Sequence, residues 1–122
     1  MRLVLLIGVL LLSSCSAVDT VQSWIPKPFD GTQLMMVTDL RVDLDRLQCG
    51  NAKGWEGVIA RADKLALYAE MRNEVQAENA RSVHENIETA AQEPDDSPLC
   101  PAMLEVAKTR LEIIGNLWGT RR

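Results

Sequence analysis

The sequence has few of the residues from which enzyme and metal sites are built. It contains one histidine, His84, whereas a zinc site needs three or four ligands. Glu88 lies one helical turn after His84, but no third ligand accompanies the pair, so we expect His84 to be an exposed helical residue. The sequence has no nucleophile motif and no glycine-rich phosphate loop, and its carboxylates fall on polar faces rather than in an apolar pocket. We therefore expect a protein that is not an enzyme and holds no metal or other cofactor.

Basic residues are also scarce relative to acidic ones. The chain has 13 Lys and Arg against 17 Asp and Glu, a formal charge of −4. Binding to nucleic acid needs a clustered basic face, so we expect no nucleic-acid partner, and no feature indicates a small-molecule substrate. We interpret Arg121 and Arg122 as a frayed, solvated end, with contact to anionic lipid or to a partner as the alternative. The acidic run over 70–96 is interpreted as a solvated face, with a docking surface for a basic partner as the alternative.

Long hydrophobic runs are absent as well. The longest one, residues 3–12, is shorter than the roughly 20 apolar residues that a membrane-spanning helix needs. It follows the basic residue Arg2 and precedes small residues, which is typical of a secretory signal peptide. The sequence therefore predicts export rather than a permanent membrane span.

The signal-like segment ends in Leu12-Ser13-Ser14-Cys15. These four residues resemble the lipobox of bacterial lipoprotein precursors, in which the signal is cut before the cysteine and the sulfur is acylated. The resemblance implies a signal peptide over 1–14 and a lipidated Cys15, with acyl chains such as palmitate anchoring the chain stably in a membrane. Ser16 follows the cysteine in place of the Asp that retains such proteins in the inner membrane. This implies the outer membrane, with the chain facing the periplasm; the alternative is an ordinary signal peptide in which Cys15 has no role.

The two other cysteines, Cys49 and Cys100, are expected to pair. Export would place them where disulfides persist, and two cysteines allow only one intramolecular bridge. A bridge between two copies of the chain is the alternative.

The mature chain divides into a tether and a domain. In the lipidated tether, residues 15–30, Pro26 and Pro28 exclude a helix. Trp24, Ile25 and Phe29 either rest in the membrane interface or pack on the domain.

The domain, residues 31–122, is predicted to be all-α. Apolar residues recur at spacings of three and four in a helix from Asp30 or Thr32 to Gln48, in the segment 55–92 and again after the loop 93–98. A short strand over 40–44 is the competing prediction for the first segment. The expected core stripes are Val37, Leu40, Leu44 and Leu47, then Val58, Ala62, Leu65 and Ala69, then a thinner stripe of Val75, Ala80, Val83, Ile87 and Ala90, and finally Leu104, Ala107, Leu111, Ile114 and Trp118.

The predicted disulfide is incompatible with one helix over 55–91. Such a helix would be about 55 Å long and the following loop reaches back roughly 30 Å, whereas bridged Cα atoms lie within about 7 Å. A break at 71–74 resolves the conflict and places Cys49 and Cys100 at one end of a small antiparallel bundle of three or four helices, closed by the disulfide. The alternative is an unbroken helix with free or intermolecularly paired cysteines.

The mature chain is also similar to small lipoproteins encoded by tailed bacteriophages. The similarity lies in the tether WIPKPFD, the segment DRLQC ending at Cys49, the sequence LALYAE and the late cysteine Cys100. It implies no catalytic residues and a protein partner in the envelope. We expect a non-enzymatic, outer-membrane interaction lipoprotein. The sharper alternatives are a spanin-like lysis subunit, a lipoprotein that excludes later phages and an assembly lipoprotein of an envelope complex.

Overall fold

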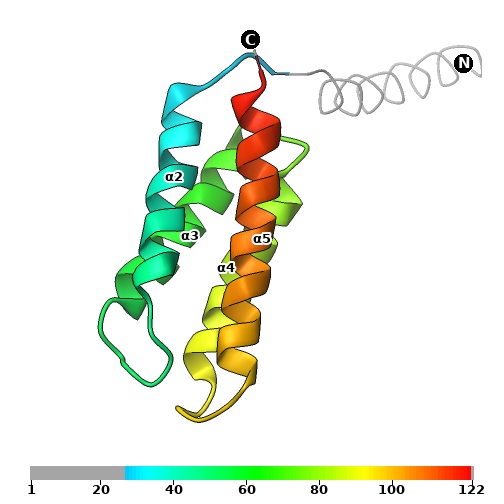
Figure 1. The fold of residues 1–122 in the computed structure, drawn as a ribbon. Helices are drawn as coiled ribbons and strands as arrows, with labels where there is room; N and C mark the ends of the chain where they lie inside the picture. The colour runs from blue at the N-terminus through cyan, green and yellow to red at the C-terminus, as the bar shows by residue number, and fades with distance from the viewer. Residues whose placement is uncertain (1–26, 122) are drawn as a thin grey trace, which may run out of the picture.

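The computed structural model describes residues 27–121, which form four helices and no strand. The helices are α2 (Gly31–Arg46), α3 (Trp55–Met71), α4 (Ala77–Gln92) and α5 (Leu99–Gly119). Each helix packs against the next, and α2 closes the ring by packing against α5 (Figure 1). The predicted antiparallel helical bundle is confirmed, and the strand over 40–44 is wrong because α2 runs through it. The predictions for the signal peptide, Cys15 and the tether up to residue 26 lie outside the described residues.

The predicted apolar stripes form the core of the bundle. All their members are buried except Leu47, which packs at the edge of the core where α2 has already ended, and Val75. The prediction for Val75 is wrong: it lies in the α3–α4 connection and is 57% exposed. Trp118 is 2% exposed, and Trp55, which lies outside these stripes, is also buried at 8%. Since burying one large aliphatic side chain contributes about 1.5–3 kcal/mol, these stripes fix which face of each helix points inward.

A Schellman motif breaks the segment 55–92 into α3 and α4. Asn73 has a left-handed backbone, with φ of 56°. Its N–H donates to the Glu70 carbonyl at 3.0 Å, and the Glu74 N–H donates to the Ala69 carbonyl at 3.0 Å, which satisfies the last carbonyls of α3. The predicted break is confirmed and the unbroken helix is wrong. The connection covers residues 72–76 instead of the predicted 71–74, since α3 ends at Met71 and α4 begins at Ala77.

Replacing Asn73 with Ala is expected to lower the free energy of unfolding by about 1 kcal/mol, because the left-handed region is costly for an ordinary Cβ. Asn73→Gly is the matched control: it also removes the amide, but glycine adopts this conformation freely. Urea denaturation measures both variants. An equal loss in the two would mean that the Asn73 side chain, rather than its backbone conformation, stabilises the turn.

The disulfide joins Cys49 to Cys100 within one chain, with the two Cα atoms 6.1 Å apart across 51 residues of sequence. This confirms the intramolecular pairing. α2 ends at Arg46 instead of Gln48, because Leu47 turns to an extended backbone and lets the chain cross toward the start of α5. The start of α2 and the end of α5 lie at one end of the bundle (Figure 1). The bridge lies at the other end, because Cys49 follows the end of α2 and Cys100 is in the first turn of α5.

Candidate functional site

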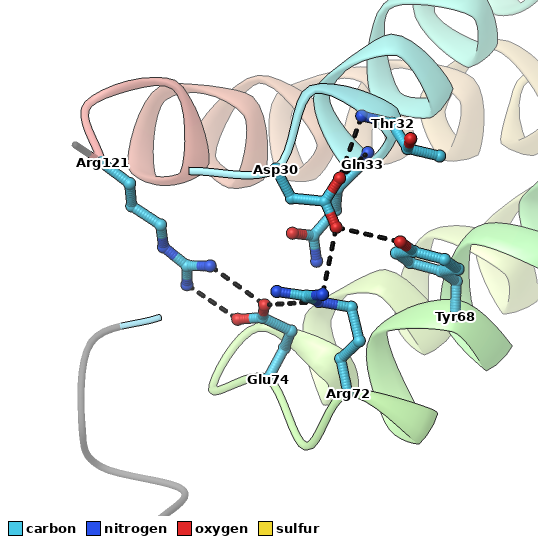
Figure 2. Close-up of polar contacts among 7 residues, drawn as sticks. All are labelled: Asp30, Thr32, Gln33, Tyr68, Arg72, Glu74 and Arg121. Carbon is cyan, nitrogen blue, oxygen red and sulfur yellow. Dashed lines mark hydrogen bonds and ion pairs between the residues drawn. The ribbon is translucent and has the colours of Figure 1, made fainter. Parts of the chain in front are cut away.

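Five polar side chains from distant segments meet at the end of the bundle where α2 begins. Figure 2 shows them directed toward one another. They come from the residue before α2, the last turn of α3, the α3–α4 connection and the residues after α5. We call this group the clasp; its members are Asp30, Tyr68, Arg72, Glu74 and Arg121.

Asp30 connects the start of α2 to α3. Its Oδ1 accepts hydrogen bonds from the backbone N–H groups of Thr32 (2.9 Å) and Gln33 (3.2 Å), so it is the N-cap of α2. Its Oδ2 accepts from the Tyr68 hydroxyl at 2.9 Å and lies 3.2 Å from Arg72 Nη1. Partial burial acts to raise the pKa of Asp30, but the hydrogen bond from Tyr68, those from the helix N–H groups and the charge of Arg72 together hold it below its usual value. The same hydrogen bond raises the pKa of Tyr68. The Asp30 carboxylate thus both caps α2 and forms an ion pair with Arg72.

Glu74 and Arg121 form the buried half of the clasp. The Glu74 side chain is 0% exposed and that of Arg121 15%. Arg121 donates through Nη1 to Oε1 at 3.0 Å and through Nη2 to Oε2 at 2.7 Å, the bidentate geometry that fits a guanidinium to a carboxylate. Arg72 Nε lies 3.5 Å from the same Oε1. Burial acts to raise the pKa of Glu74, but the hydrogen bonds and charge of Arg121 outweigh it and hold the pKa below its usual value.

This pair corrects two predictions. Arg121 is not a frayed, solvated end, and Glu74 is not part of a solvated acidic face. The physical reason is a contact between residues 47 positions apart, which no local periodicity reveals. The other acidic residues of the run are not buried.

Gln33 lies beside the clasp as a buried polar residue. It is 1% exposed, and within residues 27–121 neither its amide oxygen nor its nitrogen has a hydrogen-bond partner. Its amide nevertheless lies close enough to Glu74 to favour the charged carboxylate. A buried amide left without any partner would cost about 1–3 kcal/mol, and the nearby Glu74 carboxylate reduces that cost for Gln33.

The two carboxylates of the clasp are fully paired. Each of their oxygens faces an arginine, the Tyr68 hydroxyl or a backbone N–H. The effect of these contacts is to fasten the start of α2, the α3–α4 connection and the C-terminal end of α5 to one another.

His84 lies on α4 on the side that faces α3. The prediction that His84 is exposed is wrong. Its side chain is 13% exposed, and Nε2 lies 2.6 Å from Glu88 Oε1. Arg81 Nη1 lies 3.5 Å from its Nδ1 and also bonds Asp63 of α3, so His84 is partly covered by ion pairs that cross between the two helices. The hydrogen bonds with Glu70 and Asp63 raise the pKa of Arg81. No group of three His, Cys, Asp or Glu able to hold a metal occurs among the described residues.

A second apolar stripe runs along α5 beside the core stripe. We call it the α5 seam; its members are Leu99, Met103, Val106, Arg110, Ile113 and Leu117. Leu99, Val106, Ile113 and Leu117 are 41%, 37%, 46% and 47% exposed. Each member precedes a core residue by one position, so helical periodicity alone does not separate the exposed stripe from the buried one.

The chain matches no family model, no curated protein and no solved structure. Within residues 27–121, none of the four helices is both long enough and apolar enough to cross a membrane.

Proposed function

We propose that the protein is a lipid-anchored, non-enzymatic interaction module of the outer membrane, which faces the periplasm and binds a protein partner through a helical face. The observation that carries the interaction is the α5 seam. It places four large apolar side chains, each more than a third exposed, along one helix. Scattered exposed apolar residues are ordinary, whereas a row at heptad spacing is the pattern that receives another helix.

The disulfide supports the proposed export and anchoring. A bridge between Cys49 and Cys100 suits an oxidising compartment. Of the three cysteines in the sequence, it leaves Cys15, the residue at the end of the lipobox-like segment. The clasp then supports a fixed junction between the tether and the bundle.

Replacing Cys15 with Ser is expected to abolish incorporation of labelled palmitate and to release the chain from the membrane fraction, because the acyl chains supply the anchoring free energy. Ser16→Ala is the control and should keep both the label and the outer-membrane location. Ser16→Asp should keep the label but move the protein to the inner membrane. Labelled palmitate in the Cys15→Ser variant would refute the lipoprotein proposal.

One of the more specific alternatives is a spanin-like lysis subunit, which would bridge to an inner-membrane partner through helix contacts. Outer spanins are typically proline-rich and poorly structured, and this chain departs from them with five prolines and a closed bundle, so we rank a general interaction lipoprotein first. Deleting a spanin gene should leave infected cells as unlysed spheres. An exclusion lipoprotein expressed alone should lower phage adsorption or DNA uptake, and an assembly lipoprotein should co-purify with an envelope complex.

A further inference from the structure

We infer that the bundle stands end-on on the membrane surface, with the end where α2 begins in contact with the lipid. We call this the clasp end and the opposite one the disulfide end. The inference rests on the lipid anchor of the proposed function and adds a second, non-covalent contact with the same membrane. It follows from the polarity of the clasp end, its contrast with the disulfide end, and the distance from the proposed anchor to the bundle.

Three large apolar side chains are exposed at the clasp end. Phe29 is 47% exposed, Met71 80% and Val75 57%. They lie at the ends of elements: Phe29 precedes the N-cap of α2, Met71 is the last residue of α3, and Val75 belongs to the α3–α4 connection. Each is the sequence neighbour of a clasp member, and the ion pairs of Arg72 hold the three segments together. Exposed apolar side chains gathered in this way mark an interaction site.

The charged groups of the clasp end are covered instead. The side chains of Asp30, Glu74 and Arg121 are 14%, 0% and 15% exposed, and Arg72 pairs with both carboxylates. A protein surface in water more often exposes its charges and covers its large apolar groups. The reverse arrangement suits contact with lipid, where an unpaired charge is costly and an apolar side chain is not.

The disulfide end has the ordinary polarity. It is formed by the segments 47–54 and 93–98, in which Gln48, Lys53, Asp95 and Asp96 are exposed. Within residues 47–54 and 93–99, Leu99 is the one large apolar side chain that is more than a third exposed. The exposed carboxylates at this end would be repelled by anionic headgroups. Apolar exposure is therefore a property of the clasp end and not of bundle ends in general.

The proposed anchor supplies the membrane to the clasp end. Cys15 precedes Lys27 by 12 positions, which span at most about 40 Å when fully extended. Lys27 lies three positions before the N-cap Asp30 and so belongs to the clasp end. A tether this short gives the lipid a high effective concentration at that end. The disulfide end lies farther along the bundle by the length of α2, 16 residues or about 24 Å.

The charge of the clasp end permits contact with anionic lipid. The two carboxylates and two arginines of the clasp cancel, and Lys27 adds a positive charge. Glu70, beside Met71, is paired with Arg81 at 2.8 Å. A second copy or another protein fits less well, because three side chains cover only a fraction of the roughly 800 Å² per partner in a standard interface. A lipid contact that already has an anchor needs much less area.

The test places a fluorescent probe at either end of the full-length mature lipoprotein in vesicles of phosphatidylethanolamine and phosphatidylglycerol. Thr120→Cys carries the probe at the clasp end, and Gln92→Cys, at the last residue of α4, carries it at the disulfide end; both positions are exposed. A lipid with a spin label near its headgroup should quench the Thr120 probe at least about threefold more strongly. The reason is that interfacial groups lie within roughly 5–10 Å of the headgroup boundary, whereas α4 holds Gln92 about 24 Å away.

Variants show whether the apolar side chains make the contact. Met71→Gln/Val75→Gln should lower quenching of the Thr120 probe about threefold, to the level of the Gln92 probe, because it removes two apolar contacts with the interface. Val42→Gln/Val106→Gln is the matched control and should be quenched as wild type is. Both of these valines are also exposed, 43% and 37%, but they lie within α2 and α5, away from the helix ends.

The outcomes separate this inference from the proposed anchor. If the chain floats with the vesicles but the two probes are quenched equally, the anchor holds and the end-on contact is wrong. If Met71→Gln/Val75→Gln is quenched as wild type is, the tether alone brings this end near the lipid and the inference is overturned. If wild type does not float with the vesicles, the anchor and the inference fall together. If cross-linking in the vesicles shows a dimer that Met71→Gln/Val75→Gln dissociates, a second copy covers the clasp end and the inference is again overturned.

Discussion

Replacing Glu74 with Gln is expected to lower the free energy of unfolding by about 3 kcal/mol, since removing one member of a buried ion pair leaves the other charge uncompensated. Two arginines depend on this carboxylate: Arg121 through two hydrogen bonds, and Arg72 at 3.5 Å. Urea denaturation followed by circular dichroism measures the loss. Glu78→Gln is the matched control, because Glu78 is exposed and such surface changes stay within about 0.5 kcal/mol.

A double-mutant cycle between Glu74 and Arg121 tests whether the loss of stability comes from their ion pair or from a general effect of changing Glu74. Arg121→Met should also destabilise the bundle, and the double variant should lose less than the sum of the two single losses. Replacing both members of a buried ion pair costs little stability, whereas removing only one member leaves the other charge buried without a partner. If the losses simply add, Arg121 does not contact Glu74 in solution.

The same pair makes stability depend on pH. The pKa of Glu74 is lower in the folded protein than its usual value, so folding favours the charged form. The stabilisation is therefore complete above the pKa of the unfolded chain, about 4.3, and is lost as the pH falls through the lower folded value. Acidification should destabilise wild type more than Glu74→Gln. Asp30, whose pKa is also lowered, should leave the variant with some acid sensitivity.

Removing the disulfide should cost still more. The Cys49→Ser/Cys100→Ser variant is expected to lose about 4 kcal/mol, because the bridge closes a loop of 51 residues and restricts the unfolded chain. Single domains are stable by only about 5–15 kcal/mol, so the urea midpoint should fall sharply.

Reduction provides the matched control for this variant. Dithiothreitol should shift the urea midpoint of wild type to that of the double variant and leave the variant unchanged. Wild type should migrate as a compact monomer on non-reducing electrophoresis. A dimer that reduction dissociates would contradict the intramolecular bridge.

The helices and most of the core were predictable because their signals are local. Spacings of three and four select a buried face within one helix, and Leu40, Leu65 and Leu111 lie on those faces, at most 1% exposed. The break between α3 and α4 needed a second argument, which compared the length of a helix with the reach of the loop before Cys100. The spacing argument uses only residues within one helix. The length argument adds only one contact between residues distant in sequence, the pairing of Cys49 with Cys100.

The clasp was not predictable in the same way. Glu74 stands in an acidic run, and charge alone does not separate a buried carboxylate from the solvated ones around it. Its partner Arg121 comes from the other end of the domain, and only the packing of α5 across the bundle brings them together. The one local indication in the sequence is Asn73, a residue type that suits the left-handed position at the end of a helix. It indicates that the next residue, Glu74, lies in the connection between α3 and α4.

The positions of the disulfide and the chain ends have a mechanical consequence. A pull applied between residues 27 and 121 acts on the start of α2 and the end of α5, which lie at the same end of the bundle. These two helices therefore separate progressively from that end toward Cys49 and Cys100. There the covalent bond stops the extension, because α3 and α4 lie wholly inside the closed loop and bear no tension. Under force the protein would extend by the unfolded length of α2 and α5 and then resist further extension. Only reduction of the disulfide would allow α3 and α4 to be pulled out.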